Sequence, residues 1–339
     1  MRLDSVRELK RVLPGDIEKA FGVPAFARAL PAVARATWRH RKAPTYFLGV
    51  AKKRSGKGYS LAVRLQDHAL ERSPLVEEIA RRAKGEVDVR YVGQIWARPR
   101  ARQAHWYRSR NRPLLIGSSV GFLERGFVMA GTLGCFVRKG RSKDLYILSN
   151  NHVLADENKY RKGGAIVQPG TLDGGAAPRD AVATLSAFVT LDRARINFVD
   201  AAIAKLDGAV EANVSKLTGT GTLAGVIARD LDIGDPVSKV GRTTGIRRGR
   251  VTAVELDGVT VTYDLGVVTF DNQVEIEGAG AQAFSDAGDS GSLIVDEEGY
   301  AAALLFAGGD HGGSNGKGLT YGNPIHAVLS ALKVELAFR

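Results

Sequence analysis

The stretch Ser285-Asp286-Ala287-Gly288-Asp289-Ser290-Gly291-Ser292 is followed at once by the apolar run Leu293-Ile294-Val295. Gly-Asp-Ser-Gly ahead of a strand suits a serine on a tight turn. The glycines permit the sharp backbone, and neighbouring N–H groups are left free to point at one spot. So short a string also occurs as a plain, solvated β-turn. Assigning Ser290 as a nucleophile therefore requires a base and a carboxylate elsewhere in the chain.

A histidine and an aspartate stand upstream, each next to an apolar strand. His152 follows the run 145–148, and Asp200 opens the run 201–206. A carboxylate in that position is costly to bury unless it accepts hydrogen bonds, which an imidazole would donate. Singly, these residues are also explained as a core histidine, a strand-end acid and a turn serine. Together, the order His152, Asp200, Ser290 is the chain order of chymotrypsin-like proteases.

Over about residues 112–339 the chain resembles the trypsin-like serine peptidases of the chymotrypsin superfamily. Besides the three segments above, the likeness rests on four blocks: Gly131-Thr132-Leu133-Gly134, Gly241-Arg242-Thr243-Thr244-Gly245, Leu304-Leu305-Phe306-Ala307-Gly308 and Tyr321-Gly322-Asn323-Pro324-Ile325. Within this superfamily, the chain most resembles bacterial members that carry the Gly-Arg-Thr-Thr-Gly block, together with the plant narrow-leaf protein and its relatives. The resemblance implies a mainly β fold, a chymotrypsin-like double β-barrel with a C-terminal helix, behind a small α+β domain.

The resemblance also assigns roles to residues. His152 would be the general base, Asp200 would orient it, and the N–H groups of Gly288 and Ser290 would form an oxyanion hole. The substrate pocket would be lined by Phe284 at its floor and by Phe306, Gly308 and Gly318, with basic and apolar preferences both open. Asp289 would pair with a basic side chain, Lys239 or Arg242, instead of an N-terminal amine freed by processing.

Charge divides the 339 residues unevenly. The net charge is +12, but residues 1–112 hold 26 Lys and Arg against 10 Asp and Glu, whereas the remainder is slightly acidic. This asymmetry predicts parts with different partners. We expect a helical basic segment at 1–42, a β-β-α-β module at 43–96, an Arg/Pro linker at 97–113 and the protease domain at 114–339.

Local patterns refine the front of the chain. Pro14-Gly15 is expected to end a first helix, and Asp16 to begin a second that reaches Phe21. A third apolar stripe runs from Phe26 to Ala34. Strands are expected at 46–51, 59–65 and 86–92, with a helix that starts at Ser73-Pro74 and stops at Gly85.

Composition also indicates the compartment. No window is long and apolar enough to span a membrane, and the first residues lack a signal peptide's apolar core. The single cysteine, Cys135, forms no internal disulfide, which favours a reducing cytoplasm. No metal-ligand spacing and no phosphate-binding glycine loop is found, so neither a metal nor another cofactor is expected.

Two functions follow. The first is an intracellular serine endopeptidase that acts on proteins or peptides through an acyl-enzyme intermediate. The alternative is a non-catalytic binding or scaffold protein on a protease-like fold. The basic front domain is expected to contact the acidic protease domain or an acidic protein partner. The alternatives are a solvated basic face with no specific partner and, less favoured, a nucleic-acid contact.

Overall fold

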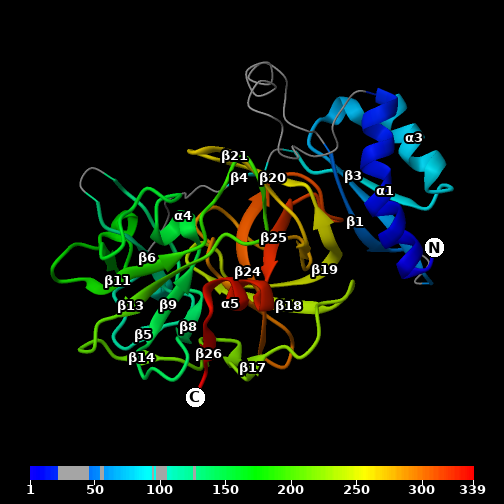
Figure 1. Ribbon diagram of the computed structural model, residues 1–339. Coiled ribbons are helices and arrows are strands. Elements are labelled where there is room, and N and C mark those ends of the chain that lie inside the picture. Colours follow the sequence, from blue (N-terminus) through cyan, green and yellow to red (C-terminus); the bar gives the residue numbers. More distant parts are fainter. Residues whose placement is uncertain (22–45, 54–56, 94, 97–104, 125–126) are drawn as a thin grey trace.

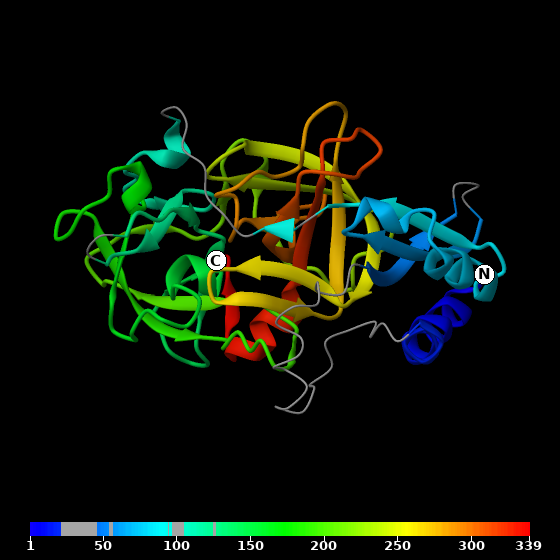
Figure 2. The ribbon, with the colours of Figure 1, turned by 90° about the horizontal axis from the view of Figure 1, so that it is seen from above.

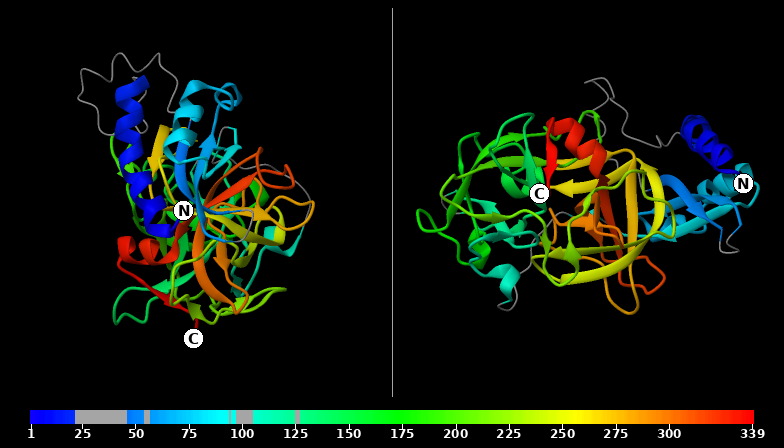
Figure 3. Two further views of the ribbon diagram at one scale, coloured as in Figure 1. Left: turned by 90° about the vertical axis from the view of Figure 1, so that its right-hand side faces the viewer. Right: turned by 90° about the horizontal axis from the view of Figure 1, so that it is seen from below.

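Three parts lie in a row in the computed structural model, which describes residues 1–21, 46–53, 57–93, 95–96, 105–124 and 127–339. A front module, made of residues 1–21, 46–53 and 57–93, stands at one end, a closed barrel lies in the middle, and a half-barrel forms the other end (Figures 1 and 2). The view from below shows the same order (Figure 3). Among the described residues, no helix is long and apolar enough to cross a membrane.

The half-barrel is an eight-stranded curled sheet. Its strands follow the order β26 (Glu335–Ala337), β8 (Cys135–Arg138), β9 (Tyr146–Ser149), β13 (Ala202–Leu206), β11 (Ala181–Phe188), β10 (Ala165–Val167), β6 (Ser119–Phe122) and β7 (Gly131–Thr132). The short helix α4 (Asn151–Leu154) follows β9 directly. His152 therefore lies on α4, directly after the end of β9.

Six strands form the closed barrel. Each pairs with the next around the ring: β18 (Pro236–Gly241), β19 (Gly245–Asp257), β22 (Gln273–Gly278), β25 (Leu319–Pro324), β24 (Tyr300–Gly309), β23 (Leu293–Val295) and back to β18. After β25, helix α5 (Ile325–Leu332) leads to β26, which returns to the half-barrel. The protein is mainly β, with the chymotrypsin-like double-barrel architecture and C-terminal helix that the sequence predicts.

One apolar cluster joins the two barrels. It contains Leu148 and Ile203 from the half-barrel and Leu293 and Leu304 from the closed barrel, all at most 2% exposed. Close packing of buried apolar side chains holds the backbone around them in place. The boundary between the barrels, where the three predicted catalytic residues lie, is thus a rigid part of the molecule.

Shorter elements complete the described chain. They are η1 (His68–Leu70), η2 (Trp106–Arg108), η3 (Thr171–Asp173), β4 (Ile95–Trp96), β5 (Leu114–Leu115), β12 (Ile196–Asn197), β14 (Ala212–Asn213), β15 (Lys216–Leu217), β16 (Gly221–Thr222), β17 (Gly225–Val226), β20 (Val259–Tyr263) and β21 (Gly266–Phe270). The β20–β21 hairpin extends the sheet of the closed barrel, and β4 lies between β20 and β24.

The front module contains the predicted β-β-α-β unit. Its elements are β1 (Tyr46–Lys52), β2 (Tyr59–Leu65), α3 (Pro74–Arg82) and β3 (Val87–Tyr91). Ser73 caps α3, because its side-chain oxygen accepts the N–H of Val76 and Pro74 occupies the first turn. The turn chemistry of this segment was therefore readable from the sequence.

The prediction of two helices before Phe21 is wrong. A single helix, α1 (Leu3–Phe21), runs through Pro14. Its Val6, Leu13 and Ile17 are fully buried on one face, in the same cluster as the module's strands. Burial of this face outweighs the hydrogen bond that proline removes. The third apolar stripe, 26–34, lies outside the described residues.

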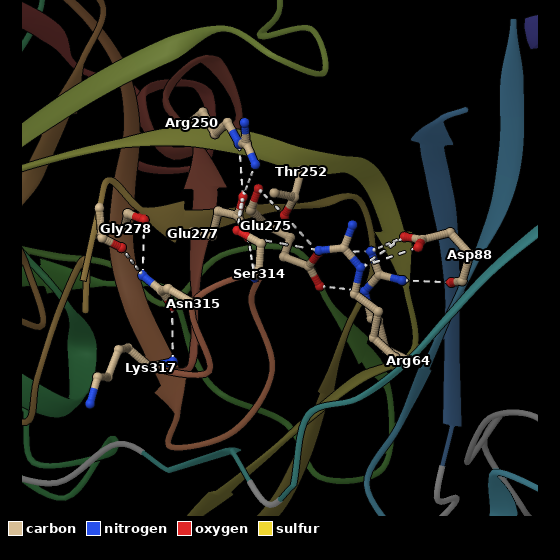
Figure 4. A network of polar contacts seen from close by, with 12 residues as sticks. Arg64, Asp88, Arg250, Thr252, Glu275, Glu277, Gly278, Ser314, Asn315 and Lys317 are labelled. Atoms are coloured by element: carbon tan, nitrogen blue, oxygen red, sulfur yellow. Dashed lines mark hydrogen bonds and ion pairs between the residues drawn. The ribbon is translucent and has the colours of Figure 1, made fainter. Parts of the chain in front are cut away.

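Backbone pairing and buried charge attach the front module to the closed barrel. β1 continues the barrel sheet by pairing with β19. Fully buried Arg64 of β2 donates from Nε and Nη2 to the two carboxylate oxygens of buried Glu275, at 2.7 and 2.9 Å (Figure 4). A bidentate pair of this kind is the favourable geometry for a buried arginine. Basic side chains of the module thus contact acidic ones of the barrel.

Part of the expected linker is packed against the barrels. Arg108 is 8% exposed and donates from Nε to the carbonyl of Arg242 at 3.0 Å. Arg112 donates to the side-chain carbonyl of Gln168 at 2.6 Å. Over residues 105–113, an arginine-rich composition therefore encodes contacts with the protein surface. Residues 97–104 lie outside the described part.

Candidate active site

His152 and Asp200 meet because their strands are neighbours. β9 and β13 pair with Ser149 opposite Ala202, so the segments beyond these two positions converge. Nδ1 of His152 lies 2.5 Å from Oδ2 of Asp200. The histidine is 5% exposed and the carboxylate is fully buried. The two residues predicted from strand-end positions therefore form a hydrogen-bonded pair.

Backbone donors satisfy the other Asp200 oxygen. Oδ1 accepts the N–H of Asn151 at 2.7 Å and that of His152 at 3.3 Å. The side-chain oxygen of Asn323 accepts the Asp200 N–H at 2.9 Å. Because a buried carboxylate is costly unless it accepts hydrogen bonds, these contacts explain how Asp200 is tolerated beneath the histidine.

Tyr263 also contacts Asp200, and the sequence did not indicate it. Its hydroxyl donates to Oδ2 at 2.8 Å, the oxygen that also faces the His152 ring. The two rings lie edge to face, with centroids 5.8 Å apart. Burial, together with the Asp200 charge, raises the pKa of Tyr263, so the phenol stays a neutral donor. Tyr263 is far from Asp200 along the chain, and no local motif marks it.

Replacing Tyr263 with phenylalanine tests this contact. We expect kcat/KM for peptide hydrolysis to fall roughly tenfold, because the buried Asp200 oxygen loses a donor. The loss should appear in kcat rather than in KM, since the Tyr263 hydroxyl contacts Asp200 and not the cavity. The measurement is kcat and KM for a peptide substrate, determined separately.

Tyr160→Phe is the matched control for that variant. The Tyr160 hydroxyl is also buried, but it donates to the carbonyls of Leu123 and Ala165 in the half-barrel. This variant should lose stability and keep kcat. An unchanged kcat for Tyr263→Phe would contradict the role of Tyr263.

Ser290 stands on a turn that only glycine permits at two positions. Gly288 and Gly291 have φ values of +97° and +91°. A Cβ at Gly288 would lie 2.5 Å from the Thr243 hydroxyl, and one at Gly291 would collide with the Ser149 side chain. Within the described chain, the Ser290 hydroxyl donates a hydrogen bond to the Phe306 carbonyl at 3.5 Å and makes none with the His152 ring. Such contacts often tighten only once substrate is bound.

The turn leaves two N–H groups for a ligand. The N–H groups of Asp286, Ala287, Asp289, Gly291 and Ser292 all donate to the protein's own oxygens. Among the described residues, those of Gly288 and Ser290 have no such acceptor. Unpaired N–H groups on a candidate nucleophile and on the residue two positions before it can stabilise an oxyanion.

The histidine segment and the serine turn pack around the strand before them. A Cβ at Gly131 would lie 2.5 Å from the Val153 side chain and 3.0 Å from the Ser290 carbonyl. The N–H of Thr132 donates to that carbonyl at 2.8 Å. Gly131 therefore has to be glycine, because the residue after His152 and the serine turn meet at this point.

Asp289 is held by Lys239. Both side chains are fully buried, and Nζ lies 2.8 Å from Oδ2. The hydroxyl of Thr244 donates to the same oxygen at 2.7 Å. Burial alone would raise the pKa of Asp289, but Lys239 and the hydrogen bonds hold that pKa below its usual value. Burial lowers the pKa of Lys239, and the Asp289 charge offsets only part of this.

Arg242, the other candidate partner, contacts a different acid. Its Nε and Nη2 donate to the two carboxylate oxygens of Asp173 at 2.7 and 2.6 Å. Its guanidinium also lies beside the turn, since a Cβ at Gly288 would be 2.9 Å from Nη1. Arg242 thus links η3 of the half-barrel with the serine turn.

An open cavity of about 860 Å³ adjoins Ser290. Of the four residues predicted to line a pocket, Gly308 lies on its wall. The other three do not line it: Phe284 and Phe306 are buried in apolar clusters, and Gly318 is buried against the Gly309 carbonyl. Spacing from Ser290 located the right segments, but both aromatic side chains pack into the apolar clusters instead of lining the cavity.

Charges of both signs line this cavity. The acids Asp286 and Asp310 and the bases Arg247 and Lys317 all belong to its wall. Ser285 and Gly309 are also part of the lining, and the Ser285 hydroxyl lies 2.6 Å from that of Thr320. Neither a basic nor an acidic substrate side chain is favoured by the lining as a whole.

Comparison with known proteins finds similar structures only at low identity. No protein-family model and no curated protein matches this sequence. Thermobifida fusca Protease A is 19% identical, with a TM-score of 0.45, over 66% of this chain and 98% of that one. Cellulomonas bogoriensis chymotrypsin is 18% identical, with a TM-score of 0.45 and coverages of 66% and 98%. A glutamic acid specific serine protease is 22% identical, with a TM-score of 0.46 and coverages of 66% and 100%. All three similar structures are proteases.

Proposed function

We propose that this protein is a serine endopeptidase that hydrolyses peptide bonds through an acyl-enzyme intermediate. The observation that carries the proposal is the combination of the buried His152–Asp200 pair with a serine turn on which the N–H groups of Gly288 and Ser290 have no acceptor among the described residues. Four groups donate hydrogen bonds to the Asp200 oxygens: the Asn151 and His152 N–H groups, the His152 ring and the Tyr263 hydroxyl. A histidine that only faces solvent would not need a buried carboxylate held in this way. A plain turn would not leave both of these N–H groups unpaired beside a cavity.

The proposed reaction has two halves. His152 Nε2 takes the Ser290 hydroxyl proton while Oγ bonds to the substrate carbonyl carbon, and the carbonyl electron pair moves onto oxygen. The N–H groups of Gly288 and Ser290 stabilise that oxyanion, at roughly 3–4 kcal/mol of barrier for each donor. Collapse breaks the C–N bond, and the amine leaves with the proton from His152.

Water completes the cycle. It gives a proton to His152 as it attacks the acyl carbon, and the second collapse releases a carboxylic acid and returns the proton to Ser290. Asp200 keeps Nδ1 protonated and stabilises the imidazolium in both halves. Hydrogen bonds from Tyr263 and from the backbone N–H groups keep Asp200 oriented. The substrates would be proteins or peptides that reach the cavity beside Ser290.

Three further predictions belong to this proposal. They are the relationship to bacterial and plant narrow-leaf-type peptidases, the triad-based trypsin-like chemistry and the cytoplasmic location. The single cysteine is compatible with a reducing compartment: Cys135 is fully buried, and burial raises the pKa of its thiol, which makes it a poor nucleophile.

A fluorophosphonate probe tests the function directly. We expect the probe to modify the protein once, at Ser290, as shown by intact mass and peptide mapping, because only an activated serine attacks it at a useful rate. Ser290→Ala and His152→Ala should block the labelling. A folded protein that the probe leaves unmodified would favour the alternative, a binding or scaffold protein on this fold.

A further inference from the structure

The two edges of β24 carry different neighbours near its end. On one edge, β25 pairs with Gly308 through Thr320 and with Gly309 through Leu319. On the other edge, β23 pairs with Leu304 and then stops. The serine turn follows there: the Gly291 N–H donates to the Leu305 carbonyl at 2.8 Å. The edge beyond Leu305 therefore begins beside the candidate nucleophile, and Phe306 is its first residue.

The protein's own strand β4 occupies the outer part of that edge. Ile95 and Trp96 pair antiparallel with Gly309 and Gly308. Since β25 already holds the opposite edge of these two glycines, β4 must lie on the edge that carries Ser290. Between the nucleophile and β4, two positions of β24 are left for pairing, Phe306 and Ala307.

β4 is anchored rather than loosely apposed. Ile95 is 1% exposed and belongs to an apolar cluster with Phe306 and Leu319. On its other side, β4 pairs with β20 through Thr262. Just before it in the chain, Tyr91 of β3 packs its ring on His311, with centroids 5.4 Å apart. Moving β4 would disturb the core beneath the cavity.

We propose that β4 closes the substrate-pairing edge of β24 at Gly308, so that about two residues before the scissile bond are recognised as a strand. The inference rests on the proposed peptidase function. Peptides commonly bind by adding a strand to a free sheet edge, and longer pairing gives tighter binding. Here a third residue meets β4 and has to leave the edge. Ile95 and Trp96 thus determine specificity for short recognition segments.

A length series of peptidyl diphenyl phosphonates tests this. The reagents carry one, two, three or four residues before phosphorus, with alanine at the added positions and the first residue chosen from Ala, Phe, Arg and Glu by labelling rate. Intact mass gives the second-order rate of Ser290 modification. We expect the rate to rise from one residue to two and to stay within about twofold from two to four, because no edge remains to pair.

Variants of β4 should restore length dependence. In Ile95→Ala and Trp96→Pro, which weaken its anchoring and its pairing, we expect the four-residue reagent to label roughly tenfold faster than the two-residue one. Ile79→Ala is the matched control: it truncates an equally buried isoleucine on α3, away from β24, and should keep the flat series.

The outcomes separate the inference from the function. If the fluorophosphonate labels Ser290 but the unmodified chain already labels about tenfold faster with four residues than with two, the inference is wrong and the function stands. A lag in labelling by the longer phosphonates that disappears in Trp96→Pro would mean that the reagent displaces β4. This outcome would also contradict the proposal that β4 stays in place and closes the edge. If neither reagent class modifies Ser290, the function fails, and the inference fails with it.

Discussion

Ser290→Ala should lower peptidase activity by at least about 10⁴-fold while the protein stays folded, because the attacking oxygen is lost. His152→Ala and Asp200→Asn should cause losses of similar order. The three residues act as one unit, so double variants should be little worse than single ones. The measurement is casein hydrolysis, together with thermal unfolding to show that the fold persists.

Ser118→Ala is the control for this series. Its side chain is also buried, and Oγ donates to the Leu115 carbonyl at 2.6 Å, which is a structural contact in the half-barrel. We expect full activity and a modest loss of stability. If Ser290→Ala cleaved casein at the rate of the unmodified protein, Ser290 would not be the nucleophile.

Lys239→Met should lower the free energy of unfolding by about 3–5 kcal/mol, because it leaves the Asp289 carboxylate buried without its cation. Activity should fall as well, since Asp289 adjoins Ser290 and its oxygens hold the Thr243 and Thr244 N–H groups and that of Asp286. Urea unfolding at several pH values, with peptide hydrolysis beside it, measures both effects.

The pH dependence of that loss has a definite sign. In the unmodified protein the pKa of Asp289 is lowered by folding, so its contribution to stability is present above the unfolded pKa and is lost as the pH falls through the folded one. Without Lys239, burial dominates and raises that pKa. The deficit of Lys239→Met should therefore shrink on acidification.

Arg11→Met provides the comparison for Lys239→Met. Arg11 pairs with Glu8 on α1, and the side chains are 72% and 60% exposed, so solvent screens the pair. We expect almost no change in the free energy of unfolding. An unchanged free energy of unfolding for Lys239→Met would show that Asp289 does not depend on Lys239.

Activity should not require a newly cut N-terminus, because Lys239 already supplies the cation that pairs with Asp289. Intact mass measured beside peptidase activity should therefore show that the uncut chain is active.

Local chemistry made much of the protein readable from the sequence. The glycine positions around Ser290, the serine cap of α3 and the hairpin of β1 and β2 follow from backbone conformations that few residues allow. The double barrel was predicted through a resemblance of several blocks in order. His152 and Asp200 were found because a polar residue at the end of an apolar strand stands out in any sequence.

Long-range contacts had no local signal. Tyr263 reaches Asp200 from a hairpin of the closed barrel, and the choice of Lys239 over Arg242 depends on which acid each side chain reaches. Phe284 has the right spacing for a pocket, yet its side chain is 1% exposed and packs in the apolar cluster that joins the two barrels. Pro14 lies inside a helix because tertiary burial outweighs a local penalty.

The sequence by itself determined the chemistry available: a serine on a glycine turn, a histidine, a carboxylate and a basic front segment. Only the tertiary structure decided how these are used. It paired Arg64 of the front segment with Glu275 of the barrel, it joined β1 to β19, and it brought β4 onto the edge of β24 beside Ser290. The physical reason is that burial and pairing depend on what surrounds a residue in space, whereas turn and cap preferences depend on the residue and its immediate neighbours.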